Sequence, residues 1–291
     1  MNNLLRKVRN YEIQIRKAIN SQMQGDFRSI FKGSGLEFDD VRPYQYGDDI
    51  RTIDWNVSAK GHGTFVKTFR EEKEQTIYFL MDLSASQDIG DPGRQKSDIG
   101  KEICGVLAIA GARESSHIGL IGFTDKRELY LRPAKGMMQA YQIISRLEQH
   151  KPESRGTDLS AGLTFALNAI KRRSVIILIT DFIDQGYERH LKALARRHDL
   201  VAIHLEDRRE TSLPNLGIVP IEDKETGTIR WVNSSFGDFR EKLTHGHRER
   251  RAAIQQLCRR HQVNFLTVPT DQDYVPLLLK LFKTRNRTQK R

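Results

Sequence analysis

Three oxygen-bearing side chains follow a short apolar run near residue 80. Residues 77–81 are apolar or aromatic, and Asp82, Ser84 and Ser86 come directly after them. One carboxylate and two hydroxyls on a single turn are donors that hard divalent cations such as Mg²⁺ and Mn²⁺ prefer. Alone the pattern is weak, because Ser84 or Ser86 would equally well cap the turn or helix that follows. Its meaning depends on where the fold places it.

Two further oxygen-bearing residues stand at comparable points later in the chain. Asp181 follows the apolar run Ser174–Thr180, and Thr157 precedes a helical pattern that begins at Leu159. Each has an ordinary alternative, because Thr157 or Asp158 would serve as a helix N-cap and Asp181 as a turn residue. Taken together, however, two carboxylates and three hydroxyls from three loops predict one metal site. The predicted ligands of an Mg²⁺ or Mn²⁺ ion are Asp82, Ser84, Ser86, Thr157 and Asp181.

From about residue 74 onward, apolar runs of strand length alternate with amphipathic helical patterns. The predicted strands are Thr76–Met81, His117–Phe123, Ser174–Thr180, Leu200–Leu205 and Val263–Val268. Between them, apolar stripes at helical spacing cover 99–110, 159–170 and 187–194. This alternation predicts an α/β fold with a doubly wound, mostly parallel sheet flanked by helices. In such sheets ligands bind beyond the carboxyl ends of the strands, where Asp82 and Asp181 stand.

Additional patterns extend this domain. Residues 127–131 predict an antiparallel edge strand paired with 117–123. Residues 218–221 and 228–232, joined by a turn that ends at Gly227, predict a hairpin insertion. The chain therefore divides into an N-terminal segment 1–73, an α/β domain 74–284 and a basic tail 285–291, which we expect to be disordered.

The charge balance narrows the class of partner. The chain of 291 residues carries 48 basic and 37 acidic side chains, a net charge of +11. This excess suits an acidic partner. Because most basic clusters fall at predicted helix ends and no nucleic-acid-binding motif occurs, we do not expect nucleic acid as the partner.

The sequence also indicates the cellular location of the protein and the state of its two cysteines. No run of about 18 apolar residues predicts a membrane span, and the N-terminus has no apolar signal core. Cys104 and Cys258 fall on apolar sides of helical patterns, which predicts buried free thiols. We therefore expect a cytoplasmic protein.

The N-terminal segment holds an unusual alternation of acidic, basic and aromatic side chains, after a helix predicted over Leu4–Ile19. Its signature residues are Arg42, Tyr44, Gly47, Asp48, Asp49, Arg51, Asp54 and Trp55. The carboxylates suggest a second cation site or catalytic acids. We prefer Asp–Arg pairing around a tight turn at Gly47, with Arg42 and Arg51 as bidentate partners and Trp55 packed inward.

The predicted metal ligands and the N-terminal signature each resemble a known family. The Asp82-x-Ser84-x-Ser86 pentad, with Thr157 and Asp181, resembles the metal-ion-dependent adhesion site (MIDAS) of von Willebrand factor A domains. There the ion keeps one position for a carboxylate of the partner. The stretch from Arg42 to Trp55 resembles the family called domain of unknown function 58 (DUF58), whose members join such a segment to a von Willebrand A-like domain.

The resemblance implies a Rossmann-like von Willebrand A fold with an N-terminal extension, and Mg²⁺ or Mn²⁺ as the cofactor. Family members often have Met or Gly after the second serine, where this chain has Gln87. That departure touches none of the predicted ligands.

The resemblance also implies a function. Proteins of this kind are typically encoded beside AAA+ ATPases of the MoxR type and are thought to assist assembly or activation of other proteins. We therefore expect a non-enzymatic adaptor for protein–protein interaction, with such an ATPase as partner. No nucleophile motif or nucleotide-binding loop is present, so neither an enzyme nor a small-molecule substrate is expected. The alternative is a Mg²⁺-dependent hydrolase or nuclease acting on phosphate esters, because bound metal ions activate water.

Overall fold

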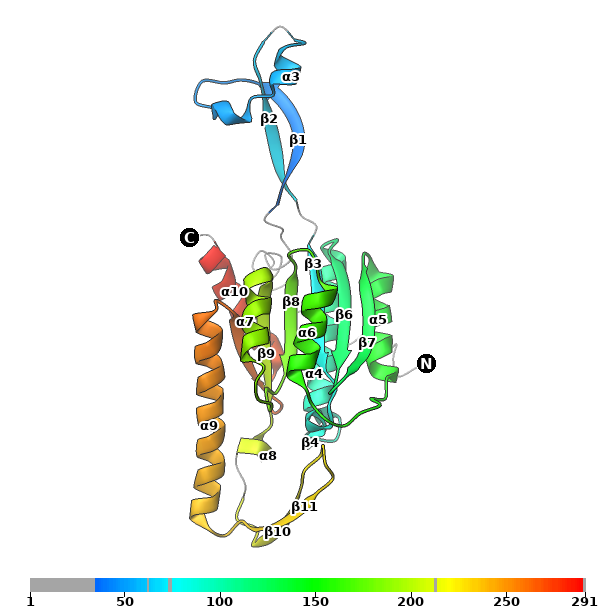
Figure 1. Ribbon diagram of the computed structural model, residues 1–291, viewed down its shortest axis with the longest axis vertical. Helices are drawn as coiled ribbons and strands as arrows, with labels where there is room; N and C mark the ends of the chain where they lie inside the picture. Colours follow the sequence, from blue (N-terminus) through cyan, green and yellow to red (C-terminus); the bar gives the residue numbers. More distant parts are fainter. Residues whose placement is uncertain (1–34, 62, 73–74, 212–213, 290–291) are drawn as a thin grey trace.

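A six-stranded sheet forms the centre of the computed structural model, which describes residues 35–61, 63–72, 75–211 and 214–289 (Figure 1). The strand order is β12-β9-β8-β3-β6-β7; neighbours pair in parallel except β6 and β7, which are antiparallel. The strands are β3 (Thr76–Asp82), β6 (His117–Phe123), β7 (Arg127–Ala134), β8 (Val175–Thr180), β9 (Asp199–Glu206) and β12 (Asn264–Pro269). The predicted helix Leu4–Ile19 lies outside the described residues.

Helices cover both faces of this sheet. One face packs against α4 (Lys96–Arg113), α5 (Met137–Gln149) and α10 (Tyr274–Gln289). The other face packs against α6 (Leu159–Ala169), α7 (Glu188–Arg197) and α9 (Gly237–Arg260). Strand β3 shows why both faces are apolar, because Phe79 and Met81 enter the first core while Tyr78 and Leu80 enter the second. The predicted α/β, doubly wound and mostly parallel fold is confirmed; α5 was not among the predicted elements.

The strand order reverses at β3. The chain proceeds from β3 to β6 and β7 on one side, then returns to place β8 on the other side of β3. The connection after β3 leads to α4 and the one after β8 leads to α7, which lie on opposite faces. Because the two connections leave toward opposite faces of the sheet, they form a crevice at the carboxyl ends of β3 and β8. Ligands of open α/β sheets bind in such a crevice.

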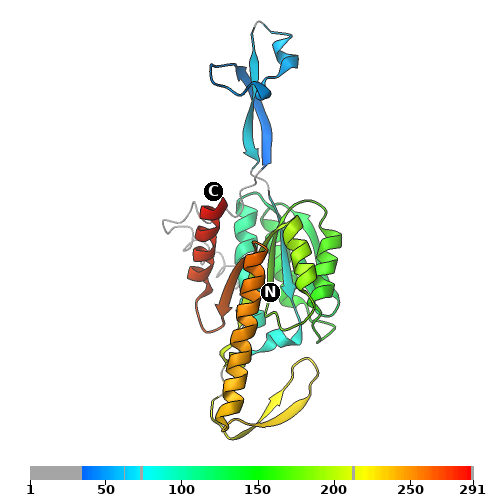
Figure 2. The same cartoon turned by 60° about the vertical axis from the view of Figure 1, so that its left-hand side comes forward.

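Two hairpins extend from opposite ends of the α/β domain. Strand β1 (Gly35–Pro43) pairs with β2 (Phe65–Glu72), and β10 (Ile218–Glu222) pairs with β11 (Ile229–Asn233). Figures 1 and 2 show β1–β2 beyond the start of β3 and β10–β11 beyond its carboxyl end. The signature of the N-terminal segment and the predicted metal site therefore lie at opposite ends of the molecule.

The signature folds as the head of the β1–β2 hairpin. Arg42 makes the expected bidentate pair with Asp48, with both N–O distances 2.8 Å. Gly47 has the positive φ of 105° that this turn requires, and the ion pair holds the pKa of Asp48 below its ordinary value. Asp49 caps the 3-10 helix η2 (Ile50–Thr52) by accepting the backbone N–H of Arg51.

One expectation about this head is wrong. Trp55, the first residue of α3 (Trp55–Ser58), is 69% exposed instead of packed inward. The inward place is taken by Ile53, which is 8% exposed and bridges to the buried Val66. A two-stranded hairpin is too thin to bury an indole ring as well. Asp54 accepts two backbone N–H groups as the N-cap of α3, so its role here is structural.

The C-terminal segment also differs from expectation. Helix α10 continues to Gln289, so most of the predicted disordered tail is helical. Its lysine and arginine residues are good helix formers, and they extend a helix that is already anchored by packing. Arg285 is buried and pairs with Asp199 at the start of β9, which ties this last part of the helix to the sheet.

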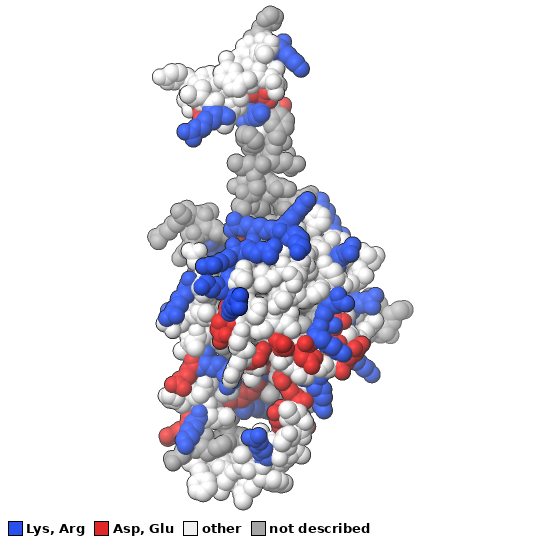
Figure 3. Space-filling view, in the orientation of Figure 1, with Lys and Arg blue, Asp and Glu red and all other residues white. Residues whose placement is uncertain are grey.

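The thiols and the charges follow the predictions more closely. Cys104 and Cys258 are buried and free, and burial raises the pKa of Cys258 to about 12. Basic pairs stand in the last turns of α7 and α9, where cations complement the helix dipole. In Figure 3, lysine and arginine side chains gather over the end of the domain nearest β1–β2. Within the described part of the chain, no helix has both the length and the apolarity needed to cross a bilayer.

His198 gives the fold a predictable sensitivity to acid. Both of its ring nitrogens are buried without a hydrogen-bond partner, and burial, together with Arg197 and Arg173, lowers its pKa to about 4. The unfolded chain takes up this proton near pH 6.5, so stability falls as pH falls from about 6.5 to about 4. His198→Leu should lose less stability between pH 7.5 and 4.5 in urea titrations than the parent. His261→Leu, at a more accessible position, is the control and should lose as much stability as the parent. Equal losses of stability in the parent and in His198→Leu would contradict the assignment.

Candidate metal centre

A row of buried polar residues follows the carboxyl ends of the parallel strands. The residues are Asp82 of β3, Thr124 after β6, Asp181 after β8, Asp207 after β9 and Thr270 after β12. Buried polar groups need hydrogen-bond partners, so this edge of the sheet is tightly constrained. Thr270 donates a hydrogen bond to Asp207, for example, which links the ends of β9 and β12.

The three residues of the predicted pentad are in direct contact. Oδ1 of Asp82 accepts hydrogen bonds from Ser84, from the backbone N at 3.0 Å and from Oγ at 2.7 Å. The hydroxyl oxygens of Ser84 and Ser86 lie 3.0 Å apart. Ser84 occupies the N-cap position of the 3-10 helix η3 (Ala85–Asp88), but its side chain makes no capping bond. The alternative of Ser84 as a simple cap is therefore wrong.

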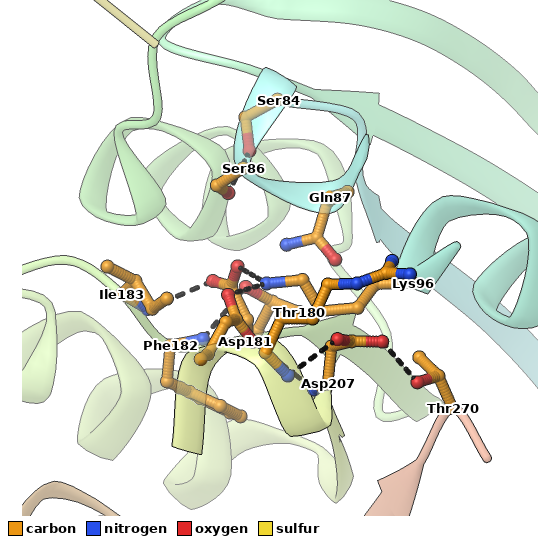
Figure 4. A network of polar contacts seen from close by, with 12 residues as sticks. Ser84, Ser86, Gln87, Lys96, Thr180, Asp181, Phe182, Ile183, Asp207 and Thr270 are labelled. Atoms are coloured by element: carbon orange, nitrogen blue, oxygen red, sulfur yellow. Dashed lines mark hydrogen bonds and ion pairs between the residues drawn. The ribbon is translucent and has the colours of Figure 1, made fainter. Parts of the chain in front are cut away.

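The other oxygen of Asp82 is held from two sides. Oδ2 accepts hydrogen bonds from Thr180 Oγ1 at 2.7 Å and from Gln87 Nε2 at 3.2 Å. In Figure 4, Gln87 lies between the two serines and the polar network around Asp181. These two donors fix the carboxylate so that Oδ1 faces the serines.

Asp181 reaches the same place from β8. Its Oδ2 accepts a hydrogen bond from Lys96 Nζ at 2.7 Å, and its Oδ1 accepts one from the backbone of Ile183 at 3.0 Å (Figure 4). Phe182 between them adopts a positive φ of 56°, an uncommon conformation for a residue with a side chain. This turn sends the ring into the core while the carboxylate faces Lys96.

Lys96 is a buried cation that the sequence did not reveal as part of the site. Its side chain is 0% exposed and also contacts Glu210 Oε1 at 2.5 Å. Burial opposes its charge, but Asp181 and Glu210 together raise its pKa, so the ammonium stays protonated. Glu210 comes from α8 (Arg208–Thr211), which follows β9. The contact joins the start of α4 to α8.

The two aspartates differ in their electrostatic balance. Burial works against the charge of Asp181, but Lys96 keeps its pKa below the ordinary value. For Asp82, burial and the nearby Asp181 raise the pKa to about 6, against the hydrogen bonds from Ser84 and Thr180. Among the residues that the structure describes, no lysine or arginine pairs with Asp82, and a positive ion beside Oδ1 would relieve the imbalance.

The arrangement of donors fits a small, hard ion. Adjacent ligands of octahedral Mg²⁺ lie about 3 Å apart, close to the oxygen spacings among Asp82, Ser84 and Ser86. Oε1 of Gln87 is buried and has no partner among the described residues. Those residues contain no group of three or more His, Cys, Asp or Glu arranged for a metal, so the donors on offer are mainly hydroxyls. The residues fit Mg²⁺ or Mn²⁺, and the ion itself stays a prediction.

Thr157 lies on the neighbouring loop, which two contacts hold in place. The backbone N of Ala85 donates to the carbonyl of Arg155 at 3.0 Å, which ties this loop to the pentad. Glu128 accepts hydrogen bonds from the backbone N atoms of Glu153 and Ser154 and fixes its first part.

The hydroxyl of Thr157 is not used as a cap. Asp158 is the N-cap of α6 and accepts the backbone N–H of Ala161. Thr157 Oγ1 instead donates to Glu225 Oε1, at 2.5 Å, in the turn between β10 and β11. Asp82, Ser84 and Ser86 are in contact, and Asp181 is near enough to raise the pKa of Asp82. The hydroxyl of Thr157 is engaged by Glu225, a residue that the prediction did not include.

Comparison with known families identifies the chain. A family model described as protein of unknown function DUF58 matches residues 40–253, which include both the signature and the site. The chain belongs to this family.

Curated relatives of this DUF58 protein come from mycobacteria. Uncharacterized protein Rv1480 of Mycobacterium tuberculosis (strain ATCC 25618 / H37Rv) is 25% identical over 285 residues, which cover 96% of this chain and 89% of the relative. Uncharacterized protein MAV169 of Mycobacterium avium is 30% identical over 133 residues, 45% of this chain and 77% of the relative.

Solved structures resemble the DUF58 chain in fold alone. An aerotolerance-related membrane protein from Bacteroides fragilis NCTC 9343, with multiple mutations to serines, has a TM-score of 0.50 at 14% identity. That match covers 74% of this chain and 99% of the other. The SpRpn10 VWA domain has a TM-score of 0.38 at 11% identity, covering 71% and 93% of the two chains. The fold of this DUF58 protein is α/β, with a mostly parallel, doubly wound sheet.

The buried Lys96 provides a test of this network. Lys96→Met would leave Asp181 and Glu210 unpaired in the interior, so it should destabilise the fold by about 3–5 kcal/mol. Urea unfolding in EDTA measures the change, and adding Glu210→Gln should restore part of the loss. Lys126→Met, which breaks the exposed pair with Glu153, is the matched control and should have little effect. Equal effects of the two lysine substitutions would contradict the network.

Proposed function

We propose that this DUF58 protein is a non-enzymatic adaptor that captures an acidic side chain of a partner protein through a bound Mg²⁺ or Mn²⁺ ion. Asp82, Ser84 and Ser86 would bind the ion, Asp181 would act beside it, and Thr157 would complete the site. The ion would supply a positive charge that a carboxylate of the partner completes.

The contacts of Asp82 with Ser84 and of Ser84 with Ser86, at the point where the strand order reverses, carry this proposal. Both oxygens of Asp181 already have protein partners, Lys96 and Ile183, so Asp181 is suited to contact the ion through water. Asp82 is buried and has no such cation beside it within the described ranges, so it is suited to direct coordination. A site with one directly coordinating carboxylate leaves charge on the ion for an acidic partner.

The expected partner is a MoxR-type AAA+ ATPase, and the expected location is the cytoplasm. Family resemblance supports the choice of partner, and a von Willebrand A-like fold suits a role in protein interaction. Binding to the ATPase would serve the assembly or activation of other proteins. Nucleic acid and small-molecule substrates are not part of the proposal.

Asp82→Asn tests the ion and the partner together. The substitution keeps the shape of the side chain but removes its charge, so it should abolish Mg²⁺ binding in calorimetry and Mg²⁺-dependent capture of a MoxR-type ATPase from the same organism. Asp271→Asn, at an exposed position after β12, is the matched control and should leave both unchanged. Circular dichroism should show that both variants stay folded.

Two results would overturn the proposed function. Capture of the ATPase that is insensitive to both EDTA and Asp82→Asn would remove the role of the ion. Mg²⁺-dependent turnover of nucleotides, DNA or RNA that is lost in Asp82→Asn would establish the enzymatic alternative instead.

A further inference from the structure

Two segments that follow β9 contact the candidate metal centre. Glu210 of α8, which precedes the hairpin insertion, contacts the buried Lys96, which also holds Asp181. Glu225, in the turn between β10 and β11 of the insertion, accepts the hydrogen bond of Thr157. In Figures 1 and 2, β10–β11 lies beyond the carboxyl end of the sheet.

The turn that carries Glu225 has a defined conformation. Asp223 Oδ1 accepts the backbone N–H groups of Glu225 at 2.9 Å and Thr226 at 3.3 Å. The backbone of Gly227 donates to the carbonyl of Asp223 at 2.7 Å, and Gly227 has the left-handed φ of 69° that closes such a turn. Side-chain and backbone bonds within the turn therefore fix where the carboxylate of Glu225 projects.

The contact between Thr157 and Glu225 is compatible with a shared ion. The hydrogen bond uses the proton of the Thr157 hydroxyl, so the lone pairs of that oxygen are still available to a cation. The hydrogen bond of 2.5 Å places the carboxylate of Glu225 directly against Thr157, one of the predicted ligands. Carboxylate is also the group that a MIDAS-like ion is expected to take from a partner.

We propose that Glu225 is a ligand of the same ion, and that the chain itself fills the position that an acidic partner would take. This inference rests on the proposed metal site. A partner carboxylate would then have to displace Glu225.

The proposal predicts opposite effects on two affinities. Glu225→Gln removes a charged ligand, so the free protein should bind Mg²⁺ or Mn²⁺ at least about tenfold more weakly in calorimetry. The same variant no longer competes with a partner carboxylate. At saturating Mg²⁺, its affinity for the partner or for an acidic model peptide should therefore rise.

The matched control is Glu222→Gln in the same hairpin. Glu222 pairs with Lys224 and not with Thr157, so this variant should bind the ion and the partner like the parent. Hydrogen exchange adds a structural measurement. Addition of Mg²⁺ should slow exchange across 218–233 in the parent and in Glu222→Gln, but not in Glu225→Gln.

The possible failures are distinguishable. If Asp82→Asn loses the ion while Glu225→Gln binds it like the parent, the role of Glu225 is wrong and the proposed function stands. If the parent itself binds neither Mg²⁺ nor Mn²⁺, both are wrong. Equal weakening in Glu222→Gln and Glu225→Gln would show a general charge effect of the hairpin and would also overturn the inference.

Discussion

The structure depends on placing two buried carboxylates side by side at the end of a parallel sheet. Asp82 and Asp181 come from neighbouring strands, so each opposes the ionisation of the other in a setting with little water. Buried like charges of this kind must be offset by cations or protons. The ammonium of Lys96 offsets Asp181 and also pairs with Glu210. The other carboxylate is left with neutral hydroxyl and amide donors, and this asymmetry makes Asp82 the centre of the candidate site.

That constraint also explains why several elements converge on this edge. The first residue of α4 carries the ammonium, α8 brings Glu210 to balance it, and the loop before α6 is tied to the pentad through Ala85. Each of these elements belongs to a different crossover, so the site is assembled only when the whole sheet has formed. The β1–β2 hairpin at the opposite end has its own ion pair, between Arg42 and Asp48, and needs nothing from this network.

Much of this could be predicted from sequence because the signal is local. The continuous apolar run 175–180 predicts a doubly covered strand, and strand ends in an open α/β sheet predict where Asp82 and Asp181 meet. Helix α5 could have been found too, since Ala140, Ile143, Ile144 and Leu147 follow helical spacing. The exposure of Trp55 could not, because it depends on how little protein surrounds a two-stranded hairpin. Asp181 is 85 residues from its partner Lys96, and Glu225 is 68 residues from its partner Thr157. No local sequence pattern indicates such distant pairings.

The hydroxyl-rich character of the site has a consequence for binding. Carboxylates hold a divalent ion more strongly than hydroxyls do, so a site built from Asp82, Ser84 and Ser86 leaves much of the ion's charge uncompensated. A nearby carboxylate is therefore attracted whether it belongs to a partner or to the chain itself, and the turn of the hairpin insertion already holds Glu225 against Thr157. A carboxylate on the same chain acts at a high effective concentration, so only a partner that gains additional contacts would replace it. Under the proposal, the hairpin insertion would therefore admit only partners that bring more than a single acidic residue.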